Sequence, residues 1–292
     1  MIDAQVFAEH RRLLFDVAYR MTGSVADADD LVQEAWLRCH DVDAAQVANP
    51  RAYLVRTVTN LSINQLTSAR ARRETYVGPW LPEPVLTEPD AGQEVEMAES
   101  ISMAMLVVLE TLTPQERAIF LLHDVFGYGH GEIASILDKS EAAVRQTAAR
   151  ARAHVAARRP RFDVDSRVRE EAAERFRQAC IGGDLNAVME LLAPDVVCWS
   201  DGGGKVSAAL RPIEGADHVA RWVVGVLAKP GSQGVVMQVA QVNGEPGLLA
   251  TFAGQPVGSI TFDLDGDQIT GLRFVVNPDK LRGLTNHYPF SR

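Results

Sequence analysis

Residues 112–161 read LTPQERAIFLLHDVFGYGHGEIASILDKSEAAVRQTAARARAHVAARRPR, and this stretch decides the fold at the centre of the chain. Thr113 precedes Pro114, and Glu116 follows the threonine by three residues, which is the pattern of a capping box with proline in the first helical turn. Gly127 and Gly129 then interrupt the apolar residues, which resume at helical spacing. The stretch therefore predicts helices separated by a turn, as in a helix-turn-helix.

The last helix of this stretch is strongly basic. Residues 140–161 hold six arginines against one acid, and Ser140 stands where it can cap the helix. The small or apolar residues that share the inner face are Val144, Ala148, Ala151 and Val155. The polar residues directed elsewhere are Arg145, Gln146, Arg150 and Arg152. Arginine and glutamine suit phosphates and base edges, so we expect this helix to bind DNA. The alternative is a solvated basic surface or a site for an acidic protein.

Charge is distributed in blocks along the 292 residues, although the net charge is −9. Residues 49–73 hold five basic side chains and no acid, whereas residues 74–104 hold seven acids and no base. The basic block at 140–161 follows. Two basic blocks separated by an acidic stretch indicate two contacts with nucleic acid, and the acidic total does not exclude them.

Composition excludes several other classes. The apolar fraction of 47% is sufficient for packed domains, and the length suggests about two of them. Cys39, Cys180 and Cys198 form no CxxC pair and no zinc-binding pattern with histidine, so we expect buried thiols, no metal and no cofactor. No apolar run reaches the roughly 18 residues that span a bilayer, and the N-terminus lacks the pattern of a signal peptide. The sequence therefore predicts a cytoplasmic protein without a membrane partner.

The segments before the helix-turn-helix are also helical in pattern. Apolar residues recur with helical period over residues 4–40, with a turn at residues 22–24, which predicts two helices. Asn49 and Pro50 open a third helix with a basic end. Residues 75–104 are rich in proline and acids and are predicted to form a linker. A flexible tether does not need an indole, so Trp80 is expected to dock on a neighbouring surface.

A different pattern begins after residue 164. Helices are predicted at 164–179, 185–192 and 216–228, with strands at 196–200 and 206–211. A meander of antiparallel strands is predicted at 235–242, 247–253, 257–264 and 268–276, joined by the turns NGEPG and DGDQ. This order predicts an α+β domain whose curved sheet is covered on one side by helices.

Three motifs in order resemble the bacterial sigma factors of extracytoplasmic-function type. They are ADADDLVQEAWLRCH (26–40), NPRAYLVRTVTNLSINQLTSARARRE (49–74) and the helix-turn-helix itself. The rest of the chain resembles SnoaL-like domains, which are cone-shaped α+β folds. The resemblance implies two all-α sigma domains and a C-terminal SnoaL-like domain. The implied boundaries are 1–74 for sigma region 2, 75–104 for the linker, 105–161 for region 4 and 165–292 for the SnoaL-like domain.

Within that family the fused chain resembles the sigma J type, in which the extra domain modulates sigma activity. Three motifs carry this resemblance: WLPEP, DGGGK and NPDKL. The residues implied to join the domains are Trp80, Leu81, Pro82, Glu83, Pro84, Asp201, Gly202, Gly203, Gly204, Lys205, Asn277, Pro278, Asp279, Lys280 and Leu281. The glycine-rich turn lacks P-loop spacing, so a phosphate site there is only an alternative.

The resemblance also assigns partners to the charged helices. Core RNA polymerase is implied to bind Asp29, Asp30, Leu31, Gln33 and Glu34. A plain solubilising role for these acids is the alternative. Promoter DNA is the second partner. Its minus-ten element is implied to meet Arg56, Asn60, Asn64, Arg70, Arg72 and Arg73, because amides can pair with an unstacked base and arginines can follow the backbone. Its minus-thirty-five element is implied to meet the basic helix that Ser140 begins.

The C-terminal domain leaves two alternatives open. The first is a cavity lined by the rings of Trp199, His218, Trp222, Phe252, Phe262 and Phe274, with Arg211 and Arg273 as polar anchors. Asp201, Asp217 and His218 are the acid–base candidates for an isomerase or hydrolase, but they form no convincing pair, so we expect no catalysis. A ligand-sensing regulator that binds operators without polymerase is the other alternative. The sequence does not identify a small-molecule ligand.

Overall fold

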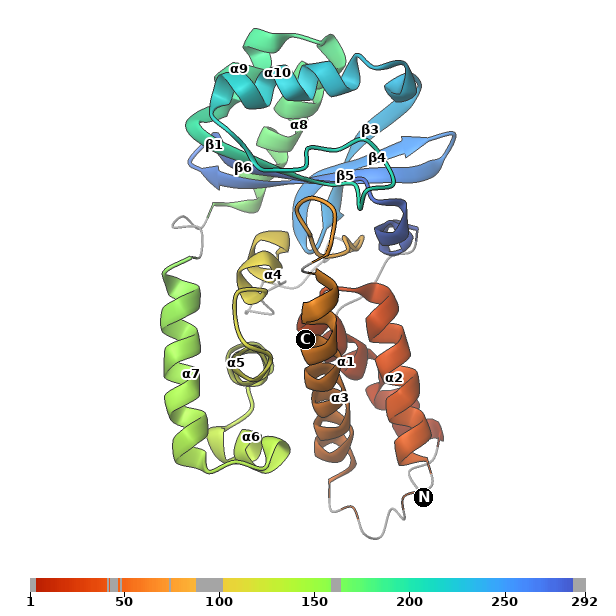
Figure 1. Ribbon diagram of the computed structural model, residues 1–292, viewed down its shortest axis with the longest axis vertical. Helices are drawn as coiled ribbons and strands as arrows, with labels where there is room; N and C mark the ends of the chain where they lie inside the picture. Colours follow the sequence, from red (N-terminus) through yellow and green to blue (C-terminus); the bar gives the residue numbers. More distant parts are fainter. Residues whose placement is uncertain are drawn as a thin grey trace.

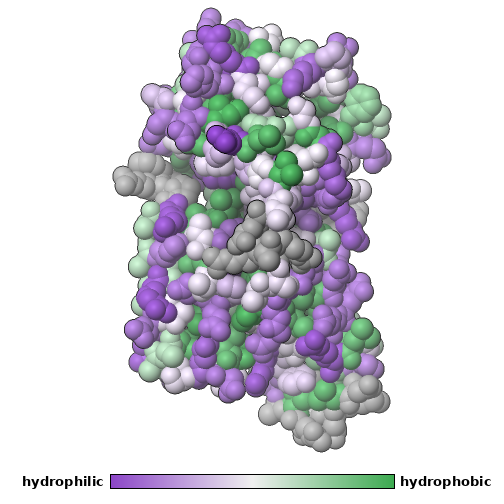
Figure 2. Space-filling view, viewed as in Figure 1, coloured by the Kyte–Doolittle hydropathy of each residue, from purple (hydrophilic) through white to green (hydrophobic). Residues whose placement is uncertain are grey.

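The computed structural model places two columns of helices beneath a sheet domain (Figure 1). It describes residues 4–40, 42, 47, 49–73, 75–87, 102–158 and 164–285, and of residues 69–73 only the backbone. Among these residues, no helix combines the length and hydropathy that crossing a bilayer requires. On the face in Figure 2, hydrophilic residues predominate over both helical columns.

The first column contains α1 (Ala4–Thr22), α2 (Val25–Cys39) and α3 (Pro50–Arg73). Ser24 ends the predicted turn and caps α2, because its hydroxyl accepts from the Asp27 amide at 3.1 Å. The apolar stripes of the three helices meet in a shared core that includes the fully buried Leu14, Val25 and Leu54. The prediction of two helices followed by a basic third is confirmed.

The second column contains α4 (Met103–Leu109), α5 (Pro114–Phe120), the π-helical η2 (Leu121–Val125), α6 (His130–Leu137) and α7 (Glu141–Ala156). The capping box at Thr113 and Glu116 is present, and Ser140 caps α7. The four residues predicted for the inner face of α7 are all buried. Sequence periodicity missed α4, which is only seven residues long.

The C-terminal domain is a six-stranded sheet in the order β2-β1-β6-β5-β4-β3, in which only the β1–β6 pair is parallel. The strands are β1 (Leu192–Asp201), β2 (Ile213–Glu214), β3 (Val235–Val242), β4 (Glu245–Phe252), β5 (Gln255–Asp265) and β6 (Gln268–Val275). One face is covered by α8 (Ser166–Gly182), α9 (Leu185–Leu191) and α10 (Ala216–Leu227), as Figure 1 shows. Short 3₁₀ turns occur at η3 (Pro230–Ser232), η4 (Pro278–Lys280) and η5 (Arg282–Leu284).

Aromatic side chains fill the space between these helices and the sheet. Phe176 meets Phe262 edge to face at 5.4 Å between ring centroids, and Trp222 meets Phe274 at 5.1 Å. The α+β prediction is confirmed, but the strand predicted at 206–211 is wrong. Val206 and Leu210 are exposed and follow a glycine turn, so their alternation has no second layer to pack against.

Part of the segment predicted as a linker is packed against its neighbours. Every residue from 81 to 87 is buried. Leu86 forms an isolated antiparallel bridge with Val242 of β3, and the Thr87 amide donates to the Gln241 carbonyl at 3.0 Å. Residues 86 and 87 therefore lie along the β3 edge of the sheet domain instead of in solvent.

Candidate nucleic-acid interface and interdomain junction

Helix α7 presents its predicted polar residues to solvent. Arg145, Gln146, Arg150 and Arg152 are exposed, while the small residues of the opposite face allow α7 to pack closely on α5 and α6. Arg145 pairs with Glu141 one turn earlier, and Arg152 Nε lies 2.6 Å from Asp124 Oδ1. Both pairs are substantially exposed, so a phosphate can replace either acid at small cost. Ser140 lies at the start of this face and also caps the helix.

Helix α3 has a second polar face. Arg56, Asn60 and Asn64 follow one another at intervals of one turn, and all three are exposed. Leu54, Val55 and Val58 are fully buried on the other side and hold the helix against α1 and α2. Arg70, Arg72 and Arg73 belong to the last turn of α3, but their side chains lie outside the described part of the chain.

Helix α2 carries the acidic residues. Asp30, Gln33 and Glu34 are exposed, whereas Asp29 is only partly exposed between Arg11 and Arg282, each 3.9 Å from a carboxylate oxygen. Leu31 is 4% exposed and belongs to the core of the first helical domain. The apolar seam of α2 faces inward here, and a role for Leu31 in binding polymerase stays a prediction.

A groove of about 250 Å³ runs beside these residues between α1 and α2. Phe7 and Trp36 form its apolar floor, with ring centroids 5.1 Å apart in an edge-to-face arrangement, and Gln33 stands at its side. An apolar groove with Arg11 and Gln33 in its lining has the anatomy of a protein-binding surface, in which an apolar centre is surrounded by polar groups.

The three motifs that join the domains meet around one buried carboxylate. Asp201, at the end of β1, is 0% exposed, and its oxygens accept from the Tyr76 hydroxyl at 2.6 Å and the Leu81 amide at 2.8 Å. Lys280 completes the shell with Nζ 2.7 Å from Oδ2. Burial, and then the hydrogen bond to Asp201, raise the pKa of the Tyr76 hydroxyl above its ordinary value, so Tyr76 stays a donor. Asp201 therefore binds the linker and the chain's last segment at one point.

Lys280 and its neighbours close this junction. Its ammonium donates to the Leu81 carbonyl at 2.5 Å and lies 4.1 Å from the centroid of the Trp80 ring. Trp80 thus has the docking surface that its sequence context predicts. Asn277 occupies the space that a Cβ at Gly203 would need, and Gly203 also has a φ of +59°, so only glycine fits there. The rest of the DGGGK motif forms the turn, and Pro278 and Asp279 are exposed.

The linker also reaches the first helical domain. Glu83 accepts from the Ser24 hydroxyl at 2.7 Å and from the Val25 amide at 2.9 Å, so its carboxylate caps the N-terminus of α2. Burial raises the pKa of Glu83 despite these hydrogen bonds. The capped helix is the one that carries the acidic residues. The WLPEP motif therefore connects the start of α2 to the sheet domain.

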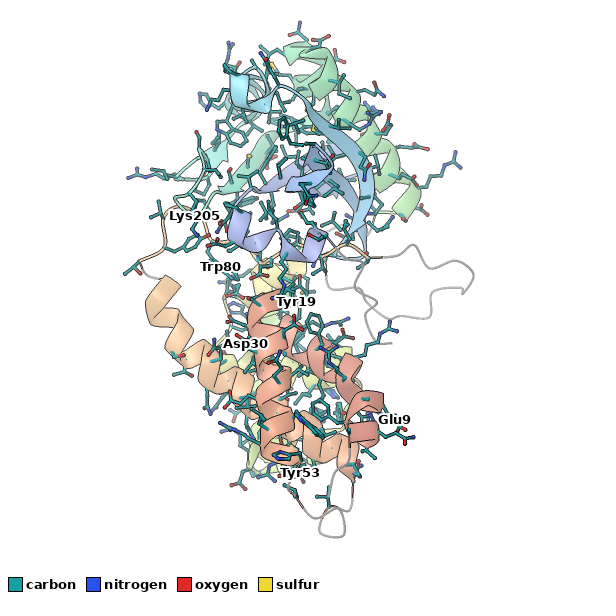
Figure 3. The ribbon with its side chains drawn as sticks, turned by 90° about the vertical axis from the view of Figure 1, so that its right-hand side faces the viewer. Glu9, Tyr19, Asp30, Tyr53, Trp80 and Lys205 are labelled. Atoms are coloured by element: carbon teal, nitrogen blue, oxygen red, sulfur yellow. The ribbon has the colours of Figure 1, made fainter. Side chains whose placement is uncertain are left out.

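Two residues that sequence reasoning missed strengthen this connection. The Tyr19 hydroxyl donates to the Glu83 carbonyl at 2.6 Å and accepts from Asn243 Nδ2 at 2.7 Å. The backbone N–H of Asn243 also donates to the Val85 carbonyl at 2.9 Å. Figure 3 shows Tyr19 and Trp80 close to the level where the helical and sheet domains meet. The NG turn was predicted as a hairpin, but nothing local indicates that it inserts between two other segments.

The acid–base candidates of the C-terminal domain fall in different places. Asp201 belongs to the junction, Asp217 pairs with Arg221 on the surface, and His218 is exposed with Nδ1 3.1 Å from the Glu214 carbonyl. Phe252 is 49% exposed, so the expectation that it lines a cavity is wrong.

The remaining cavity candidates also divide between two faces of the sheet. Phe262 and Trp222 pack beneath the helices, whereas Trp199 lies over Arg273 on the opposite face. Arg211 is exposed. These residues do not form one catalytic centre.

Comparison with known proteins identifies the family. Residues 6–72 match the family described as Sigma-70 region 2, and residues 102–155 match Sigma-70, region 4. The chain is also 42% identical to the ECF RNA polymerase sigma factor SigJ of Mycobacterium tuberculosis, over 97% of this chain and 94% of that protein. The chain belongs to the ECF RNA polymerase sigma factors. It is 28% identical to the probable ECF sigma factor SigI of the same species, over 93% and 92% of the two chains.

The likeness extends to three dimensions. The crystal structure of the M. tuberculosis sigma factor SigJ superposes with a TM-score of 0.75 at 37% identity and covers 96% of this chain and 99% of that one. In this ECF sigma factor the region 2 match coincides with α1–α3, and the region 4 match begins at Ser102, which caps α4. The superposition includes the sheet domain, so the fused architecture is common to both proteins.

Proposed function

We propose that this ECF sigma factor recruits core RNA polymerase to promoters through three surfaces. Helix α2, with Asp30, Gln33 and Glu34 beside the α1–α2 groove, binds the polymerase. The exposed face of α3 with Asn60 and Asn64 takes single-stranded bases of the minus-ten element. The observation that supports the proposal most strongly is that the basic helices α3 and α7 expose their polar faces while their apolar faces are buried.

Region 4 supplies the upstream contact in this proposal. Arg145, Gln146 and Arg150 of α7 enter the major groove of the minus-thirty-five element, while Arg152 exchanges Asp124 for a phosphate. Phosphate contacts position the helix, and glutamine and arginine side chains provide the base contacts. Each lost phosphate contact reduces the steepness of a plot of log K against log salt concentration by about one unit.

The test is transcription in vitro with core polymerase and a promoter selected from genomic fragments. We expect a promoter-specific transcript that requires the full chain and is lost at high salt. Asn64→Ala is expected to reduce open-complex formation, whereas Asn186→Ala, on the distant α9, is the matched control. Absence of a specific transcript at low salt contradicts the proposal.

We further propose that the sheet domain regulates the sigma domains without catalysing a reaction. The junction at Asp201 and the Glu83 cap join the domain to α2, and Arg282 of η5 lies 3.9 Å from Asp29 of the polymerase-binding helix. Loosening the junction with Lys280→Met should therefore change transcript yield, whereas Lys205→Met should not. Equal yields from both variants would contradict a regulatory junction.

Two other functions are weaker. An isomerase or hydrolase is disfavoured because Asp201, Asp217 and His218 lie apart, and turnover of a substrate by residues 165–292 would revive it. A regulator that binds operators without polymerase does not need the acidic α2 face. Specific binding of a duplex operator by the isolated chain would favour that function.

A further inference from the structure

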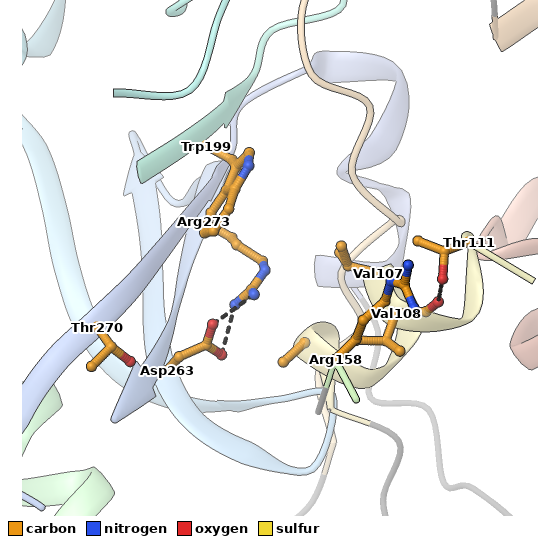
Figure 4. Close-up of a pocket in the computed structure, with 9 residues that line it drawn as sticks. Val107, Val108, Thr111, Arg158, Trp199, Asp263, Thr270 and Arg273 are labelled. Carbon is orange, nitrogen blue, oxygen red and sulfur yellow. Dashed lines mark hydrogen bonds and ion pairs between the residues drawn. The ribbon is translucent and has the colours of Figure 1, made fainter. Parts of the chain in front are cut away.

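A cavity of about 350 Å³ opens between region 4 and the sheet, apart from the Asp201 junction (Figure 4). Val107 and Val108 of α4, with Arg158 beyond the end of α7, form one wall. Trp199 of β1 and Arg273 of β6 form the other. These two residues face away from α8–α10, so the cavity is not the interior of the cone.

One N–H group of Arg273 has no hydrogen-bond acceptor among the described residues. Its side chain is 7% exposed, and its two terminal nitrogens donate to Asp263 at 2.8 and 2.6 Å. The guanidinium carbon lies 5.0 Å from the Trp199 ring centroid, but Nε has no acceptor among the described residues. Buried N–H donors almost always have an acceptor. Because this nitrogen is itself sealed from water-sized molecules, Arg273 acts on the cavity through its positive charge.

The charge of the lining indicates the charge of the ligand. The charged side chains in the cavity lining are Arg158, Arg273 and Asp263, which leave a net charge of about +1 after the ion pair is counted. The cavity therefore favours a ligand with one negative charge.

The uncharged lining defines the rest of the ligand. Ala104, Val107 and Val108 provide aliphatic contact, and the Trp199 indole stands on the facing wall. Figure 4 shows the Arg273 side chain beside Trp199 and facing Val107 across the cavity. Ligand sites commonly combine an apolar lining with a few polar groups in volumes of about 300–1,000 Å³.

We propose that this cavity binds a small organic carboxylate with a flat apolar body. The carboxylate meets the Arg158 guanidinium beside the positively charged Arg273, while the apolar body lies against Val107 and Val108, opposite the wall that Trp199 and Arg273 form. One wall comes from region 4 and the other from the sheet domain, so a ligand stabilises the arrangement in which the two are in contact. The site thereby couples a metabolite to the position of the helix-turn-helix.

The test is a calorimetric titration of the full chain with a naphthalene carboxylate and, separately, with its neutral carboxamide. We expect the carboxylate to bind at one site and the carboxamide to bind at least about tenfold more weakly, which is the loss expected for one charge-assisted hydrogen bond. Arg158→Gln should weaken carboxylate binding by about the same factor. Arg167→Gln, an exposed arginine on α8, is the matched control and should not change it.

Arg273 is not the residue to replace, because its loss would leave Asp263 buried and unpaired and would destabilise the fold itself. Val107→Phe fills the cavity instead and should abolish binding in a chain whose circular dichroism is unchanged. The proposal is overturned if the carboxylate does not bind at about 1 mM, if the carboxamide binds equally well, or if Arg158→Gln has no effect. The titration needs no polymerase, so its failure is distinct from failure of the sigma function.

Discussion

Replacing Lys280 by methionine should release the linker from the sheet domain. The substitution keeps the length and most of the volume of the side chain but removes the ammonium that lies 2.7 Å from Asp201 Oδ2. Asp201 is 0% exposed and Lys280 has a side-chain exposure of 8%, so water cannot replace the lost partner without opening the junction. The variant therefore contains a buried carboxylate without its counter-charge.

The size of the effect follows from this geometry. Unit charges 2.7 Å apart attract by about 6 kcal/mol at an effective dielectric constant of about 20. The net loss in the variant is smaller than this attraction, because methionine does not have to be dehydrated as an ammonium does. Removal of one partner from a buried pair typically costs about 3–5 kcal/mol. Asp201 retains hydrogen bonds from Tyr76, Leu81 and Gly203, which reduce the penalty. We expect about 2–4 kcal/mol for the free energy of opening the junction.

Amide hydrogen exchange measures this opening directly. The Leu81 N–H donates to Asp201 Oδ2, so it exchanges only when the junction opens. The expected loss corresponds to exchange that is roughly 30- to 900-fold faster in Lys280→Met.

Lys205→Met is the matched control, because Lys205 pairs with Asp279 in the same two motifs at 2.5 Å with side-chain exposures of 54% and 60%. Its effect should stay below about 1 kcal/mol. Equal acceleration of Leu81 exchange in both variants, or none in Lys280→Met, would refute the reasoning.

Three further predictions concern other contacts. Arg145→Glu should weaken binding of an upstream promoter duplex at least tenfold (about 1.4 kcal/mol) without lowering the melting temperature, as measured by fluorescence anisotropy, because the side chain is 65% exposed; unchanged affinity would remove α7 from the interface. Tyr19→Phe should lower the free energy of unfolding by about 1–3 kcal/mol in urea titrations, because Asn243 and the Glu83 carbonyl lose their shared partner. An unchanged free energy of unfolding would mean that Asn243 and the Glu83 carbonyl form a hydrogen bond with each other in the variant. Burial raises the pKa of Glu83 above its unfolded value of about 4.3, so its stabilising contribution is complete below that pH and is lost as the pH rises through the raised pKa. Glu83→Gln should flatten the dependence of the melting temperature on pH in that window, and parallel curves for both proteins would contradict this.

Sequence patterns among neighbouring residues were sufficient to predict most helices and strands. The capping box at Thr113, the cap at Ser140 and the alternation in the meander depend on residues within a few positions of one another, so they could be predicted from the chain alone. The same holds for the exposed faces of α3 and α7, because the helical period separates their polar and apolar residues. The error at 206–211 has the same origin, since alternation indicates a strand only where a second layer covers it.

The sequence also predicted that WLPEP, DGGGK and NPDKL act at a junction, although it did not indicate which atoms meet. The chain by itself determined the two basic helices, the acidic helix and the order of the domains, because each is a property of neighbouring residues. Only the tertiary structure decided that Asp201 is a buried junction residue, that Tyr19 and Asn243 meet across the linker, and that Arg273 faces region 4. Those contacts join segments up to 224 positions apart, and no local period records which distant surface will cover a side chain.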